Sequence, residues 1–177
     1  MAGPTAERPG ATRDVNQARH DPPELTAGEQ HELQAERERV PSARAAGIEG
    51  LKIVQRHRGW VTDAGLAALA AALELPAAEL ESVATFYNLI HRRPVGRHVI
   101  LLCDSVSCWV LGQESLQAAL ENQLGIRAGE TTPDGRFTLL PMACLGCCDR
   151  APAMMIDDDL HHGLAPDGLA AILERYE

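Results

Sequence analysis

Aromatic residues are scarce in this chain of 177 residues, which contains only two Phe, two Tyr and two Trp. Alanine and aliphatic side chains must therefore fill most of the interior, and this favours a helix-rich fold. Hydrophobic residues make up 45% of the sequence and charged residues 23%, as in an ordinary globular protein. A chain of this length can bury a core without a framework of disulfides.

Long apolar runs and an excess of positive charge are also missing. No segment approaches the ~18 consecutive apolar residues that a membrane span requires, and the N-terminal residues contain no apolar secretion signal. We therefore expect a cytoplasmic protein without direct membrane contact. Lys and Arg total 16 against 25 Asp and Glu, for a net charge of −9, which argues against nucleic acid as a partner.

Motifs for nucleotide binding and hydrolytic catalysis are absent from the sequence as well. There is no G-x-G-x-x-G motif after the predicted strand 98–103 and no Walker sequence, so the chain is not expected to bind NADH or flavin by itself. No Ser-His-Asp or paired-carboxylate arrangement stands out, and no catalytic residues are predicted.

The sequence divides into three predicted parts. Residues 1–23 are rich in Pro, Gly, Asp and Arg without helical or strand periodicity, and are predicted to be a disordered tail. Residues 24–92 are predicted to form a helical bundle. Its helices are expected within 25–38, from near Ser42 to Gly59, after Thr62, and after Pro76.

The third part, residues 93–177, changes from helical to mixed periodicity. Short apolar or β-branched runs predict strands at 98–103, 136–142 and 153–156, with a possible hairpin return at 160–164. Helices are expected after Gly112 and from 166 to 176. This order is typical of a thioredoxin-like domain, so the predicted fold class is α/β with an N-terminal helical bundle.

All five cysteines lie between positions 103 and 148, as the pairs Cys103-x4-Cys108 and Cys144-x3-Cys148 with Cys147 inside the second pair. In a reducing compartment this clustering indicates a local metal or redox site. Each pair begins at or just after the end of a predicted strand. Neighbouring strands lie about 4.8 Å apart, so loops at one carboxyl edge can bring four thiolates together.

Three kinds of site fit these spacings. A [2Fe-2S] cluster takes four thiolates and suits unequal loops, so it is favoured. A zinc site of four cysteines remains an alternative, although zinc sites of this type mostly organise domains that lack other means of folding. Thiol exchange through the C-x-x-C formed by Cys144 and Cys147 is less favoured, because that motif follows a late strand.

Four segments carry a resemblance to the E subunit of bacterial NADH-quinone oxidoreductase, respiratory complex I. They are LKIVQRHRGWV (51–61), ESVATFY (81–87), CDSVSC (103–108) and DGRFTLLPMACLGCCDRAPAMMID (134–157). The resemblance runs from about residue 24 to the C-terminus. Related subunits occur in NAD-linked formate dehydrogenases and hydrogenases, which are therefore alternative parent complexes.

The resemblance implies a helical bundle followed by a thioredoxin-like ferredoxin domain that holds one [2Fe-2S] cluster. Matched position by position, the ligands are Cys103, Cys108, Cys144 and Cys148. Cys147 occupies a position at which the family needs no cysteine, and a structural role is favoured for it.

The resemblance also implies an electron-transfer subunit of an oxidoreductase, with no NADH turnover of its own. A partner flavoprotein subunit would oxidise NADH at FMN and exchange single electrons with the cluster, next to a neighbouring iron-sulfur subunit. The assembly would be the peripheral arm of a complex on the inner face of the cell membrane. We expect the helical segment 25–91 to contact the flavoprotein, since a ferredoxin domain holds its cluster without such an appendage.

Overall fold

The computed structural model describes residues 21–176, which fall into two compact units with the boundary between Val95 and Gly96. Most of the predicted tail lies outside the described residues. Its last part, residues 21–23, is placed, and the Asp21 carboxylate lies 3.0 Å from the Arg58 guanidinium. No helix within residues 21–176 is long and apolar enough to cross a bilayer.

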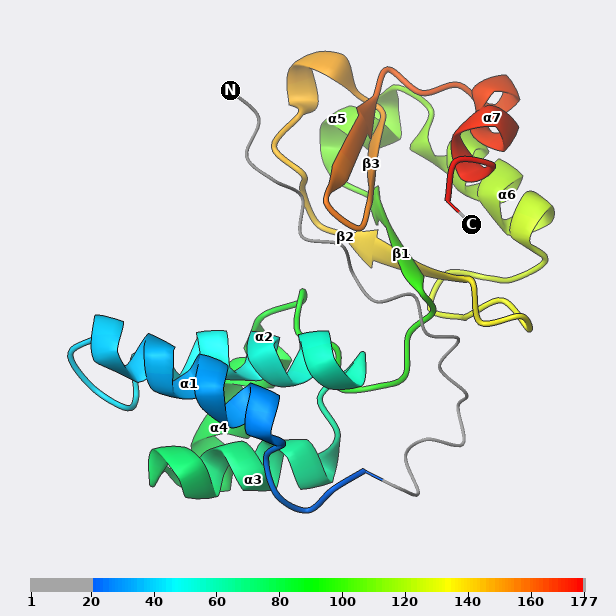
Figure 1. The fold of residues 1–177 in the computed structure, drawn as a ribbon. Helices are drawn as coiled ribbons and strands as arrows, with labels where there is room; N and C mark the ends of the chain where they lie inside the picture. Colours follow the sequence, from blue (N-terminus) through cyan, green and yellow to red (C-terminus); the bar gives the residue numbers. More distant parts are fainter. Residues whose placement is uncertain (1–20, 177) are drawn as a thin grey trace. The chain divides into compact units, whose positions relative to one another are not determined.

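The first unit consists of helices (Figure 1): α1 (Ala27–Arg39), α2 (Gly47–Arg58), α3 (Asp63–Leu73) and α4 (Ala77–Phe86). Three of the predicted helix ends, at Thr26, Gly59 and Thr62, are capped in the structure as expected. Thr26 and Glu29 form a capping box at the start of α1, and the Thr62 hydroxyl accepts from the Gly65 N–H at the start of α3. Gly59 ends α2 in the left-handed region, with φ of 87°.

One predicted helix boundary is wrong. Helix α2 begins at Gly47 and not near Ser42, because the intervening residues close shorter turns. The Ala45 N–H donates to the Ser42 carbonyl at 3.1 Å, and the Gly47 N–H donates to the Arg44 carbonyl at 3.1 Å. These bonds join residues three apart, whereas an α-helix joins residues four apart.

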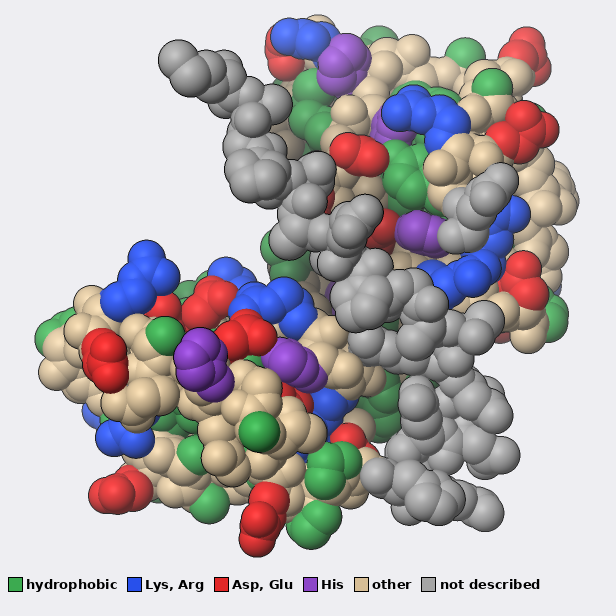
Figure 2. Space-filling model, in the orientation of Figure 1, with side chains coloured by type: hydrophobic (Ala, Val, Ile, Leu, Met, Phe, Trp, Pro, Cys, Tyr) green, Lys and Arg blue, Asp and Glu red, His purple; other side chains and the backbone are tan. Residues whose placement is uncertain are grey.

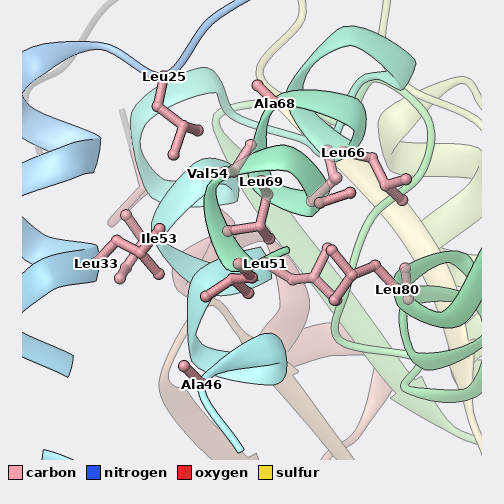
Figure 3. Packing of buried hydrophobic residues seen from close by; sticks show 14 of the residues in the cluster. Leu25, Leu33, Ala46, Leu51, Ile53, Val54, Leu66, Ala68, Leu69 and Leu80 are labelled. Carbon is pink, nitrogen blue, oxygen red and sulfur yellow. The ribbon is translucent and has the colours of Figure 1, made fainter. Parts of the chain in front are cut away.

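Aliphatic side chains from all four helices form the core of this unit (Figure 3). Leu51, Leu69 and Leu80 are each at most 1% exposed. Helices α2 and α3 pack closely at Gly50, where an added Cβ would lie 2.8 Å from a methyl carbon of Leu69. A larger residue at this position would therefore force the buried Leu69 side chain to move.

A buried ion pair ties α1 to α2. The Glu29 side chain has no solvent exposure, and its carboxylate accepts from the Arg58 guanidinium at 2.7 and 2.9 Å. Burial by itself raises the pKa of Glu29, but the hydrogen bonds from Arg58 and from the Thr26 N–H outweigh it and lower that pKa. Over the visible surface of this unit, acidic and basic side chains are interspersed (Figure 2).

The second unit contains a four-stranded sheet in the order β2-β1-β3-β4. The strands are β1 (His98–Cys103), β2 (Phe137–Met142), β3 (Ala153–Ile156) and β4 (Asp159–His162). Strands β1 and β2 are parallel, and the other neighbours are antiparallel. The connection from β1 to β2 contains α5 (Val106–Val110) and α6 (Gln113–Leu124), while η2 (Cys148–Arg150) precedes β3.

One face of the sheet packs against α6 and the C-terminal helix α7 (Leu169–Leu173), which follows the 3-10 turn η3 (Pro166–Gly168). Alternate residues of β1, β2 and β3 contribute to this core, as a pleated strand requires. They are Ile100, Leu102, Phe137, Leu139, Met154 and Ile156. Near the C-terminus, Tyr176 is 8% exposed and its hydroxyl donates to Asp159 at 2.9 Å.

The α/β fold with a helical N-terminal part agrees with the prediction, but two elements differ. The sequence periodicity predicts no element over 104–111, whereas the structure has the helix α5 there. A helix of five residues is too short to show apolar periodicity, and it contains the β-branched Val106 and Val110. The helix expected over 166–176 is divided into η3 and the short α7.

Candidate metal centre

The pairing of β1, β2 and β3 brings the two cysteine segments to one edge of the sheet (Figure 1). Cys103 is the last residue of β1 and lies opposite Met142, the last residue of the parallel strand β2. The Asp104 N–H extends this pairing by donating to the Met142 carbonyl at 2.9 Å. Strand β3 runs antiparallel, with Met154 opposite Leu102, so it begins at the same edge. Both cysteine segments therefore lie at this edge, as predicted, but Cys108 lies in α5 and Cys148 in η2 and not in open loops.

Cys103 and Cys108 form a buried thiol pair at this edge. Each is 2% exposed, and together with Ala153 they form a small buried cluster of their own. Cys103 is positioned by β1 and Cys108 by α5, so the short helix that periodicity does not reveal holds one of the predicted ligands.

The electrostatics of Cys108 reflect this burial. Loss of solvent raises the pKa of the Cys108 thiol to about 11, and the neighbouring Cys103 adds to the shift as a hydrogen-bond partner and through its charge. The backbone N–H of Ala153 donates to Cys108 and opposes the shift. The charge of Cys148 also acts on Cys108, which places that thiol in the neighbourhood of the pair.

The second cysteine loop, between β2 and β3, is more open. Cys144 and Cys148 are exposed, and Cys147 is half-buried and packs against the cluster that contains the buried thiol pair. Gly146 adopts φ of 74°, and its N–H donates to the Cys144 sulfur at 3.3 Å. Gly112, which could also have brought its amide to a sulfur, donates instead to the Trp109 carbonyl at 3.2 Å.

Within residues 21–176, no group of three or more His, Cys, Asp or Glu side chains that could hold a metal ion is found. The donor chemistry is that of a [2Fe-2S] cluster, which takes four cysteines shared between two irons. The buried thiol pair and the N–H groups of Ala153 and Gly146, which donate to cysteine sulfurs, fit such a group.

The C-x-x-C motif of Cys144 and Cys147 lacks the setting that activates a dithiol. A reactive thiol of this kind sits at a helix N-terminus, where the helix dipole lowers its pKa. Neither Cys144 nor Cys147 lies within a helix, and Cys147 only precedes the three-residue 3-10 turn η2. The structure therefore adds no support for thiol exchange.

An apolar surface lies directly outside the buried thiol pair. It consists of Val106, Trp109, Val110 and Leu111 on and next to α5, with exposures between 56% and 69%, and we call it the α5 patch. The Trp109 indole N–H donates to Glu114 at 3.0 Å, so this ring is held at the surface. Periodicity alone does not reveal this patch, although an uncharged run from Ser105 to Gly112 is visible in the sequence.

Comparisons with known proteins agree with this geometry. The family model described as thioredoxin-like [2Fe-2S] ferredoxin matches residues 33–177. The NADH-quinone oxidoreductase E subunit of Escherichia coli (strain K12) is 53% identical over 154 residues, covering 87% of this chain and 93% of that protein. The corresponding E subunit of Pseudomonas aeruginosa is 52% identical over 152 residues, covering 86% and 92%.

Among solved structures, an NAD+-reducing [NiFe]-hydrogenase in the air-oxidised state is similar, with a TM-score of 0.62 and 28% identity. The match covers 71% of this chain but only 22% of the hydrogenase chain, so it concerns a part of that larger protein.

Proposed function

Since this chain belongs to the thioredoxin-like [2Fe-2S] ferredoxin family, we propose that it is the electron-transfer E subunit of an NADH-quinone oxidoreductase, with one [2Fe-2S] cluster. The observation that carries this proposal is the buried thiol pair, Cys103 and Cys108, at the shared carboxyl edge of β1 and β2. When bound, the cluster supplies one-electron oxidation and reduction.

The chain's own residues would hold and insulate the cluster. Cys103 and Cys108 would supply one pair of thiolates from the interior, and Cys144 and Cys148 the other pair from the open loop. The N–H groups of Ala153 and Gly146 already donate to cysteine sulfurs, and such bonds stabilise the added negative charge of a reduced cluster. The buried pair would exclude water from its side of the site, whereas the second loop leaves Cys144 and Cys148 open to solvent.

The proposed partner is a flavoprotein subunit that oxidises NADH at FMN and exchanges single electrons with this chain. Electron transfer requires the partner to come close to the cluster, and the uncharged α5 patch is the apolar surface next to Cys108. Large contiguous apolar patches on a protein surface mark interaction sites. A neighbouring iron-sulfur subunit completes the proposed surroundings, in a peripheral arm on the cytoplasmic side of the membrane.

The helical unit is proposed to add a second contact with the flavoprotein. At and after the end of α4 it exposes Phe86 by 80%, Tyr87 by 45% and Leu89 by 47%. The Phe86 and Tyr87 rings meet edge to face with centroids 5.1 Å apart, so they form a continuous aromatic surface. Phe86→Ala is expected to weaken binding of the flavoprotein without loss of iron, and unchanged binding would contradict this contact.

The experiment that tests the main proposal is anaerobic purification of the full chain with iron and sulfide analysis, visible spectroscopy and electron paramagnetic resonance. We expect a brown protein with about two iron atoms per chain and a paramagnetic signal only after reduction. Cys108→Ala is expected to lose the iron. A colourless, redox-silent protein that contains zinc would overturn the proposal in favour of a zinc-binding interaction module.

The parent complex has one specific alternative. The similarity to a part of an NAD+-reducing hydrogenase supports the equivalent subunit of a hydrogenase as the alternative. The equivalent subunit of an NAD-linked formate dehydrogenase is the other alternative that the sequence resemblance implies. Purification of the complex from cells through a tag on this chain decides between them, because the accompanying subunits differ. Enrichment of quinone-reducing NADH dehydrogenase activity is the expected result.

A further inference from the structure

We propose that Gln55 is a positioning residue, which holds the turn after α4 in the conformation that binds the flavoprotein. The inference rests on the proposed function, because it assumes that the helical unit contacts this partner at the end of α4 and just after it. The turn comprises residues 87–91, and we call it the post-α4 turn. Gln55 lies in α2, 34 residues before Leu89 in the chain.

The side-chain amide of Gln55 holds the post-α4 turn by two hydrogen bonds of opposite direction. Its Nε2 donates to the Leu89 carbonyl at 2.9 Å, and its Oε1 accepts from the His91 N–H at 2.6 Å. Residues 87–91 contain no helix or strand, so these backbone groups have no partner from a regular element. A carboxylate could accept from His91 but could not donate to Leu89, whereas an amide does both.

The post-α4 turn has a buried side and an exposed side. Ile90 is 6% exposed and belongs to the core of the helical unit, whereas Tyr87 and Leu89 are 45% and 47% exposed. Residues 82–91 contain no Asp, Glu, Lys or Arg, and the same is true of residues 105–112 around the α5 patch. Depletion of charged residues is typical of the core of a protein interface. The shared composition favours the flavoprotein as the occupant of both surfaces.

The turn is ordered before any partner binds, and this is where Gln55 acts. A segment that becomes ordered only on binding loses affinity, because its conformational entropy is lost in that step. Here the Ile90 N–H already donates to the Tyr87 carbonyl at 2.9 Å, and the Val61 N–H donates to the His91 carbonyl at 2.8 Å. The two bonds of Gln55 add a tie to α2, so that the exposed side chains keep one arrangement.

The test measures binding of the purified flavoprotein subunit to full-length Gln55→Leu and wild-type chains. We expect the variant to bind about 5- to 30-fold more weakly with unchanged iron content, as the loss of two neutral hydrogen bonds implies. Hydrogen exchange at the Ile90 N–H should be faster in the free variant. Gln55→Glu, which removes only the donor to the Leu89 carbonyl, should also weaken binding. Gln30→Leu is the matched control, because Gln30 donates to the Leu25 carbonyl at 2.8 Å in the same unit, and it should bind like the wild type.

A second set of variants shows whether Gln55 acts through the turn. Combined Tyr87→Ala and Leu89→Ala substitutions remove the side chains that the turn presents, so that adding Gln55→Leu should cause no further loss of affinity. An equal loss with and without these side chains would overturn the inference.

Binding of both Gln55 variants within about twofold of the wild type would overturn it as well. Circular dichroism of the free variants separates a loosened turn from loss of the fold. If the wild type binds no flavoprotein, or if Tyr87→Ala with Leu89→Ala leaves binding unchanged, the proposed contact itself fails. That result is distinct from a failure of Gln55 to position the turn.

Discussion

Replacement of Trp109 by alanine tests the link between the α5 patch and partner binding. Trp109 is 56% exposed, and its indole N–H donates to the Glu114 carboxylate at the surface, so the side chain does little for the fold. An exposed tryptophan at the centre of an interface is, in contrast, among the side chains that contribute most to binding. The variant should therefore lose affinity for the flavoprotein and keep its iron.

The size of the effect follows from the exposed surface. A tryptophan can bury about 250 Å², so an exposed fraction of 56% corresponds to about 140 Å². At about 25 cal/mol per Å², complete cover of this area is worth about 3.5 kcal/mol. Alanine retains part of the contact, and an expected loss of about 2 to 3 kcal/mol weakens binding about 30- to 140-fold.

The assay is titration of the purified flavoprotein subunit with wild-type and variant chains, by calorimetry or surface binding. Leu160→Ala is the matched control, because Leu160 is 45% exposed on β4 of the same unit but lies outside the α5 patch. It should leave the dissociation constant unchanged. A Trp109→Ala protein that binds within twofold of the wild type, with the same iron content, would refute the assignment of this patch.

Three further predictions concern stability. Glu29→Gln removes a fully buried carboxylate from Arg58 and should lower the free energy of unfolding by about 3 kcal/mol near neutral pH, measured by urea denaturation. Because the pKa of Glu29 is lowered in the folded state, the difference from wild type should shrink as pH falls below about 4.3, and a constant difference would contradict the ion pair. Burial raises the pKa of Tyr176 to about 12. Because the unfolded chain loses this proton near pH 10, the free energy of unfolding should fall as pH rises from about 10 to 12. Tyr176→Phe should abolish this fall and remove one step from the ultraviolet titration of tyrosine. Leu120 has no solvent exposure, so Leu120→Ala should lower the free energy of unfolding by about 2 to 5 kcal/mol. Leu111 is 57% exposed, and Leu111→Ala should change it by no more than about 0.5 kcal/mol. Equal effects would mean that the core is assigned wrongly.

Much of the secondary structure was predictable because its signals are local. Thr26, Thr62 and Gly59 mark helix ends through their own backbone and hydroxyl chemistry, and the structure uses them as expected. The start of α2 near Ser42 was predicted wrongly, and the helix α5 was not predicted. In both places turn, 3-10 and α geometries differ little in free energy over a few residues. Contacts with residues outside the segment therefore determine which geometry forms.

Residue order and turn chemistry are enough to show that five cysteines lie in two segments, that a strand precedes each segment, and that the chain resembles a [2Fe-2S] family. Which of the thiols are buried cannot be read from residue order. Burial depends on strand order, on the antiparallel direction of β3 and on the packing of α5, all of which join residues distant in sequence. That is why Cys103 and Cys108 become an interior pair while Cys144 and Cys148 stay at the surface, a difference that the x4 and x3 spacings do not predict.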